Sequence, residues 1–538
     1  MIGHLRLAVG RLSAVLIFAS IVACGGCGHG GSSPFTIGGS VSGLAGSGLV
    51  LQNSAGGSLA VSANGNFTFS GSAASGSPYG VTVATQPVSP SQFCTVANGS
   101  GTVTSGNVTN VAVTCANTYA LGGVVRFLFG SGLVLKNGDS TATVSADGTF
   151  SFNDKVATGS AYAVTVSSQP TGPGQMCTVM NGAGTMATSD INNVTVRCVG
   201  DTARFAYVSG HSGVFCYSID QVTGALTSIG ASPCAAGLLT GFATEPRGKF
   251  GYAADGTGVV HSYSIDPSSG ALTELAGGDA VAEFNPVDVH VDPSGRFVYV
   301  ANYGAGISGY SIDPASGHLT AVPGSPFSTA PNPNRVTVDA SARFVYVANN
   351  DVHGMKGVSG FTIDSNTGSL TPIAGSPYGT PNWATDVALN PAATFAFATI
   401  PDENAVAVFA IDSMTGVLTP IEGSPFPTGT SPDGVVVDLT GSFLYVANSS
   451  DGTISGYAIN PTTGALTPLA GSPYPCPGLP NYLSVNPRPG FLVVSNGGNS
   501  TVGTYSIDPQ TGVLAQVPGS PAPAVGGSTG IYSISFAP

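Results

Sequence analysis

An eleven-residue stretch that recurs seven times in the C-terminal part of the sequence constrains the fold more than any other feature. One copy reads Tyr310-Ser-Ile-Asp-Pro-Ala-Ser-Gly-His-Leu-Thr320. An aromatic residue, Ile, an acidic or amide residue, a turn, Gly and Leu in this order are typical of a β-hairpin, in which Gly provides a positive φ. The copies begin 46 to 51 residues apart, at Tyr217, Tyr263, Tyr310, Phe361, Phe409, Tyr457 and Tyr505. This period predicts a propeller or a solenoid.

Each repeat contains further segments with strand character, which gives four strands per unit. One full unit has strand-like segments starting at Pro286, Phe297, Ile307 and Gly317, with turn formers between them. The second segment of each unit begins at a Phe, at positions Phe205, Phe250, Phe297, Phe344, Phe395, Phe443 and Phe491. Seven four-stranded units predict a seven-bladed β-propeller.

The two ends of this repeat region predict how the ring closes. The first unit begins at its second strand, Arg204-Phe-Ala-Tyr-Val208, without a first strand upstream. The sequence finishes with Ile531-Tyr-Ser-Ile-Ser-Phe536, which matches a first strand that no second strand follows. We expect the C-terminal strand to pair with Phe205 to Val208, because this pairing removes two exposed sheet edges.

A second repeat fills residues 35–199. Gly48-Leu-Val-Leu-Gln-Asn53 returns as Gly132-Leu-Val-Leu-Lys-Asn137, and further matching blocks follow 83 or 84 residues apart. Short alternating runs with Asn-Gly and Asp-Gly turns predict a small antiparallel sandwich for each copy, and the copies resemble bacterial immunoglobulin-like stalk domains. The predicted fold class is therefore all-β, with a seven-bladed β-propeller preceded by two small antiparallel β-sandwich domains.

Six of the cysteines fall into three pairs. Two pairs have the same spacing of 21 residues and the third has a spacing of 18. In an exported protein such pairs predict disulfides; a metal site is the alternative for the first two pairs, although no His or further Cys lies beside them. The pairs are Cys94 with Cys115, Cys177 with Cys198, and Cys216 with Cys234, while Cys27 and Cys476 are left over.

The N-terminal segment has the pattern of an export signal. His4, Arg6 and Arg11 precede an apolar run from Leu12 to Val22, which is too short to span a bilayer as an anchor. The run ends at Ile21-Val22-Ala23-Cys24, which resembles a bacterial lipobox; the resemblance implies cleavage before Cys24 and lipid on its thiol. The alternative is an ordinary secretory signal.

These patterns divide the chain into five parts and predict its location. They are a signal peptide (1–23), a Gly/Ser tether (24–34), two sandwiches (35–116 and 117–200) and the propeller (201–538). The residue after Cys24 is Gly25, whereas an Asp at this place resembles a signal that retains lipoproteins at the inner membrane. We therefore expect a lipid-anchored protein of the bacterial cell envelope at the outer membrane, on its periplasmic or its outer side.

Composition limits the partners. Only 8% of the residues are charged and the formal net charge is −13, so no basic stripe exists to neutralise nucleic acid phosphates. We expect a monomer without cofactors or metal, whose partners are the membrane, through its lipid, and a carbohydrate, lactone or protein ligand at the propeller face. The histidines are scattered over different repeats, which gives no metal-ligand spacing.

Two repeated motifs resemble the YVTN-repeat and lactonase family of seven-bladed propellers, which includes bacterial 6-phosphogluconolactonase and fungal carboxymuconate cyclase. They are Phe297-Val-Tyr-Val-Ala-Asn302 and Tyr310-Ser-Ile-Asp313 with their counterparts, and the resemblance covers about residues 202–538. It implies Arg, His and Glu gathered on one axial face, from the starts of first strands and the ends of second strands. No repeat here has the family's Arg-His followed by Asn-Glu, and Pro401-Asp402 is followed by Glu403-Asn404 where the family has Leu-Gly.

The candidate site residues come from those strand ends. A lactonase needs a cation or donor at the carbonyl oxygen, for which Arg335 is the candidate, and a base for water, for which the candidates are Asp386, Asp402 and Glu403. The alternative for Arg335 is a surface ion pair. The candidate ligand-binding residues are Asp288, Asn302, Asn349, Asp433, Asn448 and Tyr482. The alternative for the repeated Asn is that it caps a turn, since Asn tolerates a left-handed φ.

Three weaker signals remain. Gly526-Gly-Ser528-Thr-Gly530 matches a nucleophile-elbow pattern, but it lies in a Gly-rich loop without a strand-to-helix turn. His290 alternates with Val289 and Val291 on a first strand, so it is expected to face the channel. The recurrent Gly-Ser-Pro-aromatic motif is interpreted as a blade-edge turn with an aromatic plug.

The sequence leaves two functions open, besides a structural repeat with no ligand. The first is a binding or interaction module, favoured by the low charge and the missing family residues. The second is a lactone hydrolase, a carboxylic ester hydrolase, favoured by the family resemblance. Phosphate binding needs more than one cation, and Arg335 stands nearly alone among the candidates.

Overall fold

The computed structural model describes residues 34–128, 130–171, 175–200, 203–230, 233–350, 357–486, 490–523 and 531–537. Among these residues the regular structure is β, apart from the 3-10 helix η1 (Pro401–Glu403). None of the described helical structure is long and apolar enough to span a membrane. The signal segment with Cys24, the tether with Cys27, and the Gly526–Gly530 motif lie outside the described residues. The chain divides into two compact units between Thr118 and Tyr119.

The first unit has two sheets facing one core. One sheet contains β1 (Phe35–Ser42), β4 (Gly65–Ala73), β6 (Gln92–Ala97) and β8 (Val108–Tyr119), and the other contains β2 (Leu49–Asn53), β3 (Ser58–Val61), β5 (Pro78–Thr85) and β7 (Ser100–Thr102). Alternate residues such as Leu49, Leu51 and Phe69 point inward and are at most 2% exposed. The predicted disulfide Cys94–Cys115 joins β6 to β8.

The second sequence repeat forms an equivalent pair of sheets. One sheet contains β9 (Leu121–Arg126), β12 (Gly148–Ser151), β15 (Gln175–Met180) and β17 (Ile191–Gly200). The other sheet contains β10 (Leu133–Asn137), β11 (Ser140–Val144), β14 (Ala161–Ser168) and β16 (Ala183–Thr185). A further short strand is β13 (Val156–Ala157). The predicted disulfide Cys177–Cys198 joins β15 to β17.

One strand pair in each repeat differs from the predicted antiparallel arrangement. β1 runs parallel to β8, and β9 runs parallel to β17. These strands are the first and last of their repeats and no hairpin joins them. Alternation of apolar residues fixes which face of a strand is buried but leaves its direction open, so the sequence could not reveal the parallel pair.

The propeller contains seven sheets, as predicted. Blade 1 has β18 (Phe205–Gly210), β19 (Gly213–Ile219), β20 (Leu226–Ser228), β21 (Ala235–Ala236) and β50 (Ile531–Ala537). Blade 2 has β22 (Leu239–Thr244), β23 (Phe250–Asp255), β24 (Val259–Ile265), β25 (Leu272–Glu274) and β26 (Ala280–Val281). Blade 3 has β27 (Pro286–Val291), β28 (Phe297–Asn302), β29 (Gly306–Ile312) and β30 (Leu319–Ala321). Blade 4 has β31 (Pro333–Val338), β32 (Phe344–Asn349), β33 (Gly357–Ile363) and β34 (Leu370–Pro372).

The last three blades follow the same antiparallel order. Blade 5 has β35 (Val387–Leu389), β36 (Phe395–Ile400), β37 (Ala405–Ile411), β38 (Leu418–Pro420) and β39 (Phe426–Pro427). Blade 6 has β40 (Pro432–Val437), β41 (Phe443–Asn448), β42 (Thr453–Ile459), β43 (Leu466–Pro468) and β44 (Tyr474–Pro475). Blade 7 has β45 (Pro480–Val485), β46 (Phe491–Asn496), β47 (Thr501–Ile507), β48 (Leu514–Gln516) and β49 (Ala522–Pro523).

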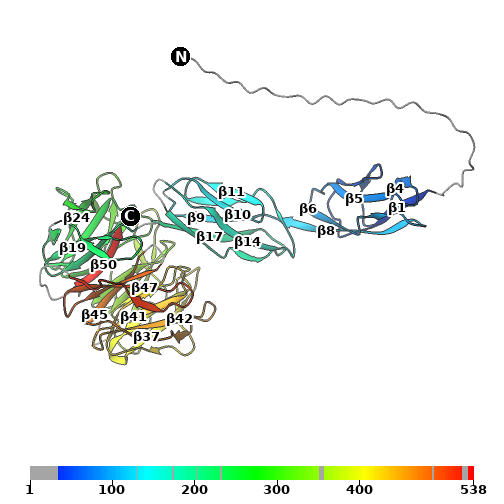
Figure 1. The fold of residues 1–538 in the computed structure, drawn as a ribbon. Coiled ribbons are helices and arrows are strands. Elements are labelled where there is room, and N and C mark those ends of the chain that lie inside the picture. The colour runs from blue at the N-terminus through cyan, green and yellow to red at the C-terminus, as the bar shows by residue number, and fades with distance from the viewer. Residues whose placement is uncertain are drawn as a thin grey trace, which may run out of the picture. The chain divides into compact units, whose positions relative to one another are not determined.

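The C-terminal strand closes the ring as predicted. β50 pairs antiparallel with β18, from Phe205 opposite Ala537 to Val208 opposite Ile534. In Figure 1 this red strand lies among the green strands of blade 1. The Ser533 hydroxyl lies 2.8 Å from that of Ser209 and accepts a hydrogen bond from the Phe242 amide of blade 2. The third predicted disulfide, Cys216–Cys234, is also present in blade 1.

The recurrent hairpin Gly is explained by packing between blades as well as by its φ. Gly317 has φ +77°, and a Cβ built there would lie 2.5 Å from the Phe250 ring of the preceding blade. The same Gly-on-Phe contact recurs around the ring, including the step from Phe491 of blade 7 to Gly224 of blade 1. The hairpin of each blade therefore packs on the second strand of the blade before it, and only Gly fits between them.

Candidate functional site

The entrance to the propeller axis is built from one position on each first strand. Because β27, β31 and β45 pair with their second strands in the same register, Asp288, Arg335 and Tyr482 occupy equivalent places. We call this ring the axial layer; its members are Ser533, Gly241, Asp288, Arg335, Asp386, Gly434 and Tyr482. Side chains of different blades therefore converge at one level of the channel.

Arg335 extends across the channel instead of pointing to solvent. Its residue is 8% exposed, Nη1 lies 3.8 Å from Asp288 Oδ1, and the guanidinium lies 5.0 Å from the centre of the Tyr482 ring. Arg335 belongs to blade 4 and Tyr482 to blade 7, on the opposite side of the ring. The surface ion pair considered for Arg335 is therefore wrong, because the side chain forms a buried plug with residues of two other blades.

Two carboxylates flank the plug and also tie neighbouring blades together. Asp288 Oδ2 accepts the Val336 amide of blade 4 at 2.9 Å, and Asp386 Oδ2 accepts the Val435 amide of blade 6 at 3.0 Å. Burial raises the pKa of Asp288 to about 6, although Arg335 opposes this shift, and burial also raises the pKa of Asp386. Burial alone would lower the pKa of Arg335, but the Asp288 and Asp386 charges raise it above its usual value.

A pocket of about 650 Å³ opens above the plug. Polar and apolar groups contribute about equally to its wall, and Arg335 forms part of its floor. Other lining residues are His211, Asn334, Asn350, Trp383, Thr385, Asp433 and Asn481. Burial, reinforced by the Asp386 charge and opposed by that of Arg335, raises the pKa of Asp433 to about 6. A carboxyl with this pKa exchanges protons near neutral pH, as a general base must.

Local hydrogen bonds hold the wall in place. The Trp383 indole Nε1 donates to Asp402 Oδ2 at 2.8 Å, and Asp402 lies in η1. Asn404 follows η1 with φ +50°, a left-handed conformation that Asn adopts more readily than most residues. The Asn334 amide donates to the Thr385 carbonyl at 2.7 Å, which fixes the orientation of one lining amide. The wall is therefore largely preorganised.

The structure brings together only some of the candidate residues. Arg335, Asp288, Asp386, Asp433 and Tyr482 meet at the axis, and Asp402 reaches the wall through Trp383. Glu403 is exposed and does not line the pocket.

The repeated Asn residues lie elsewhere. Asn302, Asn349 and Asn448 are fully buried at the ends of second strands and donate to their own hairpins; the Asn302 amide, for example, donates to Ser308 Oγ at 3.0 Å. None of the three lines the pocket. Their side chains bond across the turn of their own hairpin, as the turn-cap alternative expects, but without the left-handed φ.

Most lining residues were not among the sequence candidates, including the amides of Asn334, Asn350 and Asn481 as well as Trp383 and His211. Trp383 is the only Trp of the chain, a signal that could have drawn attention to it. His211 lies in the turn between β18 and β19, with no motif around it. His290, expected to face the channel, lies two residues after Asp288 on β27 and therefore on the same face of the strand, and burial lowers its pKa to about 4.

No metal-ligand set is found in the pocket wall. Among the residues that the structure describes, the one group of three His, Cys, Asp or Glu side chains with metal-ligand spacing lies in blade 2 and outside the pocket lining. The pocket can therefore offer hydrogen bonds, one guanidinium, one carboxyl with a raised pKa and an aromatic ring.

Sequence comparison finds a family model that matches part of the propeller. The family model for lactonases with a 7-bladed β-propeller matches residues 276–381 and 373–479. No curated protein matches the chain.

Solved structures share the fold of the propeller at low sequence identity. The periplasmic gluconolactonase PpgL of Pseudomonas aeruginosa is 16% identical with a TM-score of 0.52, over 62% of this chain and 99% of that one. A candidate 6-phosphogluconolactonase of Bacteroides fragilis has the same identity and score, over 62% and 98%. A Lactobacillus plantarum protein is 19% identical with a TM-score of 0.52, over 63% and 100%.

Proposed function

Because the family model for lactonases with a 7-bladed β-propeller matches residues 276–479, we propose that the axial pocket of this chain binds a small, uncharged, hydroxylated compound of the sugar or sugar-lactone class. In this proposal the protein is a binding module of the cell envelope. One observation carries it, namely a preorganised pocket of about 650 Å³ whose wall combines neutral hydrogen-bonding groups with a single indole.

The lining chemistry supports a hydroxylated ligand. Asn334, Asn350 and Asn481 offer amide donors and acceptors, Thr385 offers a hydroxyl, and Asp433 offers carboxyl oxygens. Trp383 adds an aromatic surface with its polar end already bonded to Asp402. A volume of several hundred Å³ with a few convergent polar groups is typical of a small-molecule site.

The charges at the floor support an uncharged ligand. Arg335 already faces Asp288 and Tyr482, and Asp386 and Asp433 lie within its electrostatic reach. Its charge is therefore largely balanced by the protein before a ligand arrives. A phosphorylated sugar needs unbalanced cations at its phosphate, so the pocket should prefer neutral sugars or lactones over sugar phosphates.

Lactone hydrolysis is the second candidate function, favoured by the pKa of Asp433. In this reaction water attacks the lactone carbonyl and Asp433 accepts a proton of the water. Asp433 then returns this proton to the ring oxygen as the ring C–O bond breaks, which gives the open hydroxy acid. Arg335, at the pocket floor, would stabilise the developing oxyanion. Among the residues first considered as bases, Asp386 is buried against backbone amides and Asp402 is bonded to Trp383, which makes Asp433 the better candidate.

Trp383 fluorescence provides a direct test, because no other Trp contributes to the signal. The purified protein is titrated with glucono-δ-lactone, gluconate, glucose and 6-phosphogluconate, and lactone opening is followed by acid release at constant pH. We expect a saturable fluorescence change with neutral ligands and at least a tenfold weaker response in Asn481→Ala. The exposed Glu403→Gln serves as the matched control and should bind like the wild type.

Each outcome separates the two functions. Binding without acid release above the spontaneous rate supports the binding module, whereas acid release that is lost in Asp433→Asn supports the hydrolase. A failure of all neutral sugars and lactones to perturb Trp383, or tighter binding of 6-phosphogluconate, would refute the proposed ligand class.

The same proposal includes export and lipid attachment at Cys24 of a monomeric protein. It is supported by the lipobox-like segment and by three disulfides, which are typical of oxidising compartments. Labelling with a fatty-acid analogue in a bacterial host, followed by detergent-phase partition, tests it. The wild type should carry the label and enter the detergent phase; a Cys24→Ala variant that does both would contradict it.

A further inference from the structure

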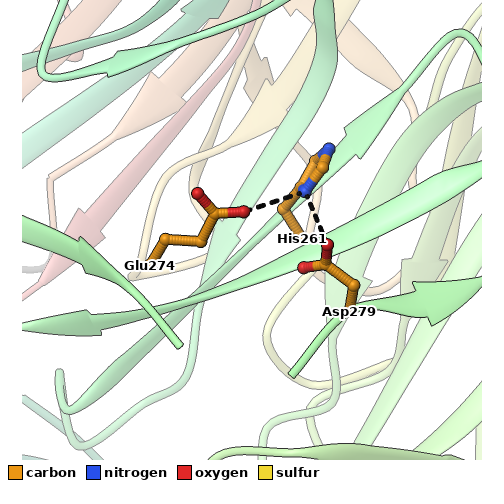
Figure 2. Close-up of side chains that lie close together, drawn as sticks. All are labelled: His261, Glu274 and Asp279. Carbon is orange, nitrogen blue, oxygen red and sulfur yellow. Dashed lines mark ion pairs between the residues drawn. The ribbon is translucent and has the colours of Figure 1, made fainter. Parts of the chain in front are cut away.

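A histidine of blade 2 is surrounded by three carboxylates outside the axial pocket. His261 lies on β24; its Nδ1 is 3.4 Å from Glu274 Oε1 and 3.3 Å from Asp279 Oδ2, as Figure 2 shows. The Nδ1 atom is buried and makes no hydrogen bond, although the two carboxylate oxygens are close. The Glu274 and Asp279 side chains are 57% and 44% exposed, so an ion can reach the group from solvent.

The third carboxylate determines how the ring is held. Asp255 Oδ2 lies 3.4 Å from His261 Nε2, on the other side of the imidazole. Asp255 is itself fixed, because its Oδ1 accepts the backbone amides of Thr257 and Val259, each at 2.9 Å. A proton on Nε2 is therefore stabilised by Asp255, and the lone pair of Nδ1 then faces the two oxygens of Glu274 and Asp279.

We infer that His261 Nδ1, Glu274 and Asp279 bind a divalent metal ion, with Zn²⁺ preferred, and that Asp255 positions the histidine. The separations fit a small tetrahedral ion: with bonds of about 2.1 Å, neighbouring ligand atoms of a tetrahedral Zn²⁺ site lie about 3.4 Å apart. A histidine whose other nitrogen donates to a carboxylate is the usual arrangement at such sites. Three protein ligands leave a fourth position for water.

Comparison of the blades supports a dedicated site, because four replacements coincide in blade 2. Asp255 stands where blades 3, 4 and 6 have Asn302, Asn349 and Asn448, and His261 stands where they have Ser308, Ser359 and Ser455. In those blades the Asn amide donates to the Ser hydroxyl. In blade 2 this neutral pair has become a carboxylate and an imidazole.

The remaining two ligands are also specific to this blade. Glu274 ends the Leu-Thr-Glu strand, where other blades have Ala, Pro, Gln or Ser, and Asp279 takes the place of Pro in the Gly-Ser-Pro-aromatic turn. The aromatic plug that covers the third strand in blades 3, 4 and 6 is Ala280 here. Blade 2 therefore has metal-ligand side chains where blades 3, 4 and 6 have the Gly-Ser-Pro-aromatic turn.

Isothermal titration of the purified, metal-stripped protein with ZnCl₂ tests the inference. We expect one Zn²⁺ per chain at this site, with affinity reduced at least about 100-fold in His261→Ala and Glu274→Gln, and about 10- to 100-fold in Asp255→Asn. His318→Ala and Glu283→Gln remove the same side-chain types outside the group and should bind like the wild type. Co²⁺ in place of Zn²⁺ should give the intense visible absorption of a tetrahedral nitrogen and oxygen site, which His261→Ala loses.

Two results would overturn the inference. One is a wild type that binds no Zn²⁺, which would leave His261 and its three carboxylates as a polar cluster without a metal. The other is Zn²⁺ binding with the same affinity in His261→Ala and Glu274→Gln, with circular dichroism showing that both variants are folded. Neither result depends on ligand binding or catalysis at the axial pocket.

Discussion

The buried position of Arg335 leads to a quantitative prediction for stability. With Nη1 3.8 Å from Asp288 Oδ1, Coulomb's law gives about 4 kcal/mol of attraction at an effective dielectric constant of 20. Replacing Arg335 with Met preserves much of the side-chain volume but leaves Asp288 and Asp386 without their cation. We therefore expect Arg335→Met to lower the free energy of unfolding at pH 7.5 by about 3 to 5 kcal/mol.

A double-mutant cycle with Asp288→Asn isolates the pairwise contribution. The amide side chain in this variant would keep an oxygen for the Val336 amide but would carry no charge, so the double variant should recover part of the loss. We expect a coupling energy of at least about 1 kcal/mol, measured by urea unfolding. Trp383 fluorescence follows the transition of the propeller alone, since the chain has no other Trp.

The pH dependence of the same variant provides a second check. Without Arg335 the pKa of Asp288, already raised to about 6 in the folded protein, should rise further. A carboxyl with a raised folded-state pKa contributes stability below its unfolded pKa and loses that contribution as the pH rises through the folded value. The destabilisation by Arg335→Met should therefore be larger at pH 8 than at pH 5. A loss below about 1 kcal/mol, zero coupling, or a larger loss at pH 5 would refute the plug as described.

Three further predictions follow from the packing and the pKa values. Gly317→Ala should lower the free energy of unfolding in urea by at least about 2 kcal/mol more than Gly519→Ala. Both glycines have a positive φ, but only a Cβ at position 317 would meet a ring, that of Phe250. Equal losses would show that φ strain alone explains the recurrent Gly at this turn. Truncation after residue 530 removes β50 and exposes the edge of β18, so the shortened protein should unfold at lower temperature and aggregate; a monomer with unchanged melting would contradict closure by this strand. Burial raises the pKa of Asp433 to about 6, so ionisation of this group should lower the free energy of unfolding of the wild type by up to about 3 kcal/mol between pH 4 and pH 7. Asp433→Asn should remove this part of the pH dependence of unfolding. Identical pH dependence in the two proteins would argue against the raised pKa.

The sequence predicted the propeller because its pattern is local and repeated. Each hairpin carries its own turn residues, and the Phe at the start of each second strand recurs with the period. The pairing of β50 with β18 was also predictable, since an unmatched first strand at the C-terminus complements an unmatched second strand at Phe205. The contact of each hairpin Gly with a Phe of the preceding blade was not, because spacing along the chain contains no information on which blades touch.

The site was harder to predict for a related reason. Arg335 and Tyr482 are separated by three blades, and only the ring geometry brings them to 5.0 Å. The repeated Asn residues attracted attention because they recur, but recurrence in several blades is expected of a residue that stabilises the hairpin of its own blade. The residues that differ between blades are better markers of a site: the axial layer has seven equivalent positions and only one of them is Arg.

The single Arg among seven equivalent positions is evidence for a ligand site at the axis. We give it more weight than the absence of the Arg-His and Asn-Glu pairs, which argues against such a site. A propeller that served only as a scaffold could fill the axial layer with small residues, as Gly241 and Gly434 do, where neighbouring strands approach closely. Instead, one guanidinium is buried with two carboxylates that also bind the backbone of adjacent blades. Such an arrangement contributes little net stability, because desolvation of the charges offsets their attraction. Its consequence is a rigid polar floor beneath a 650 Å³ pocket, which a ligand can use and an unoccupied scaffold does not need.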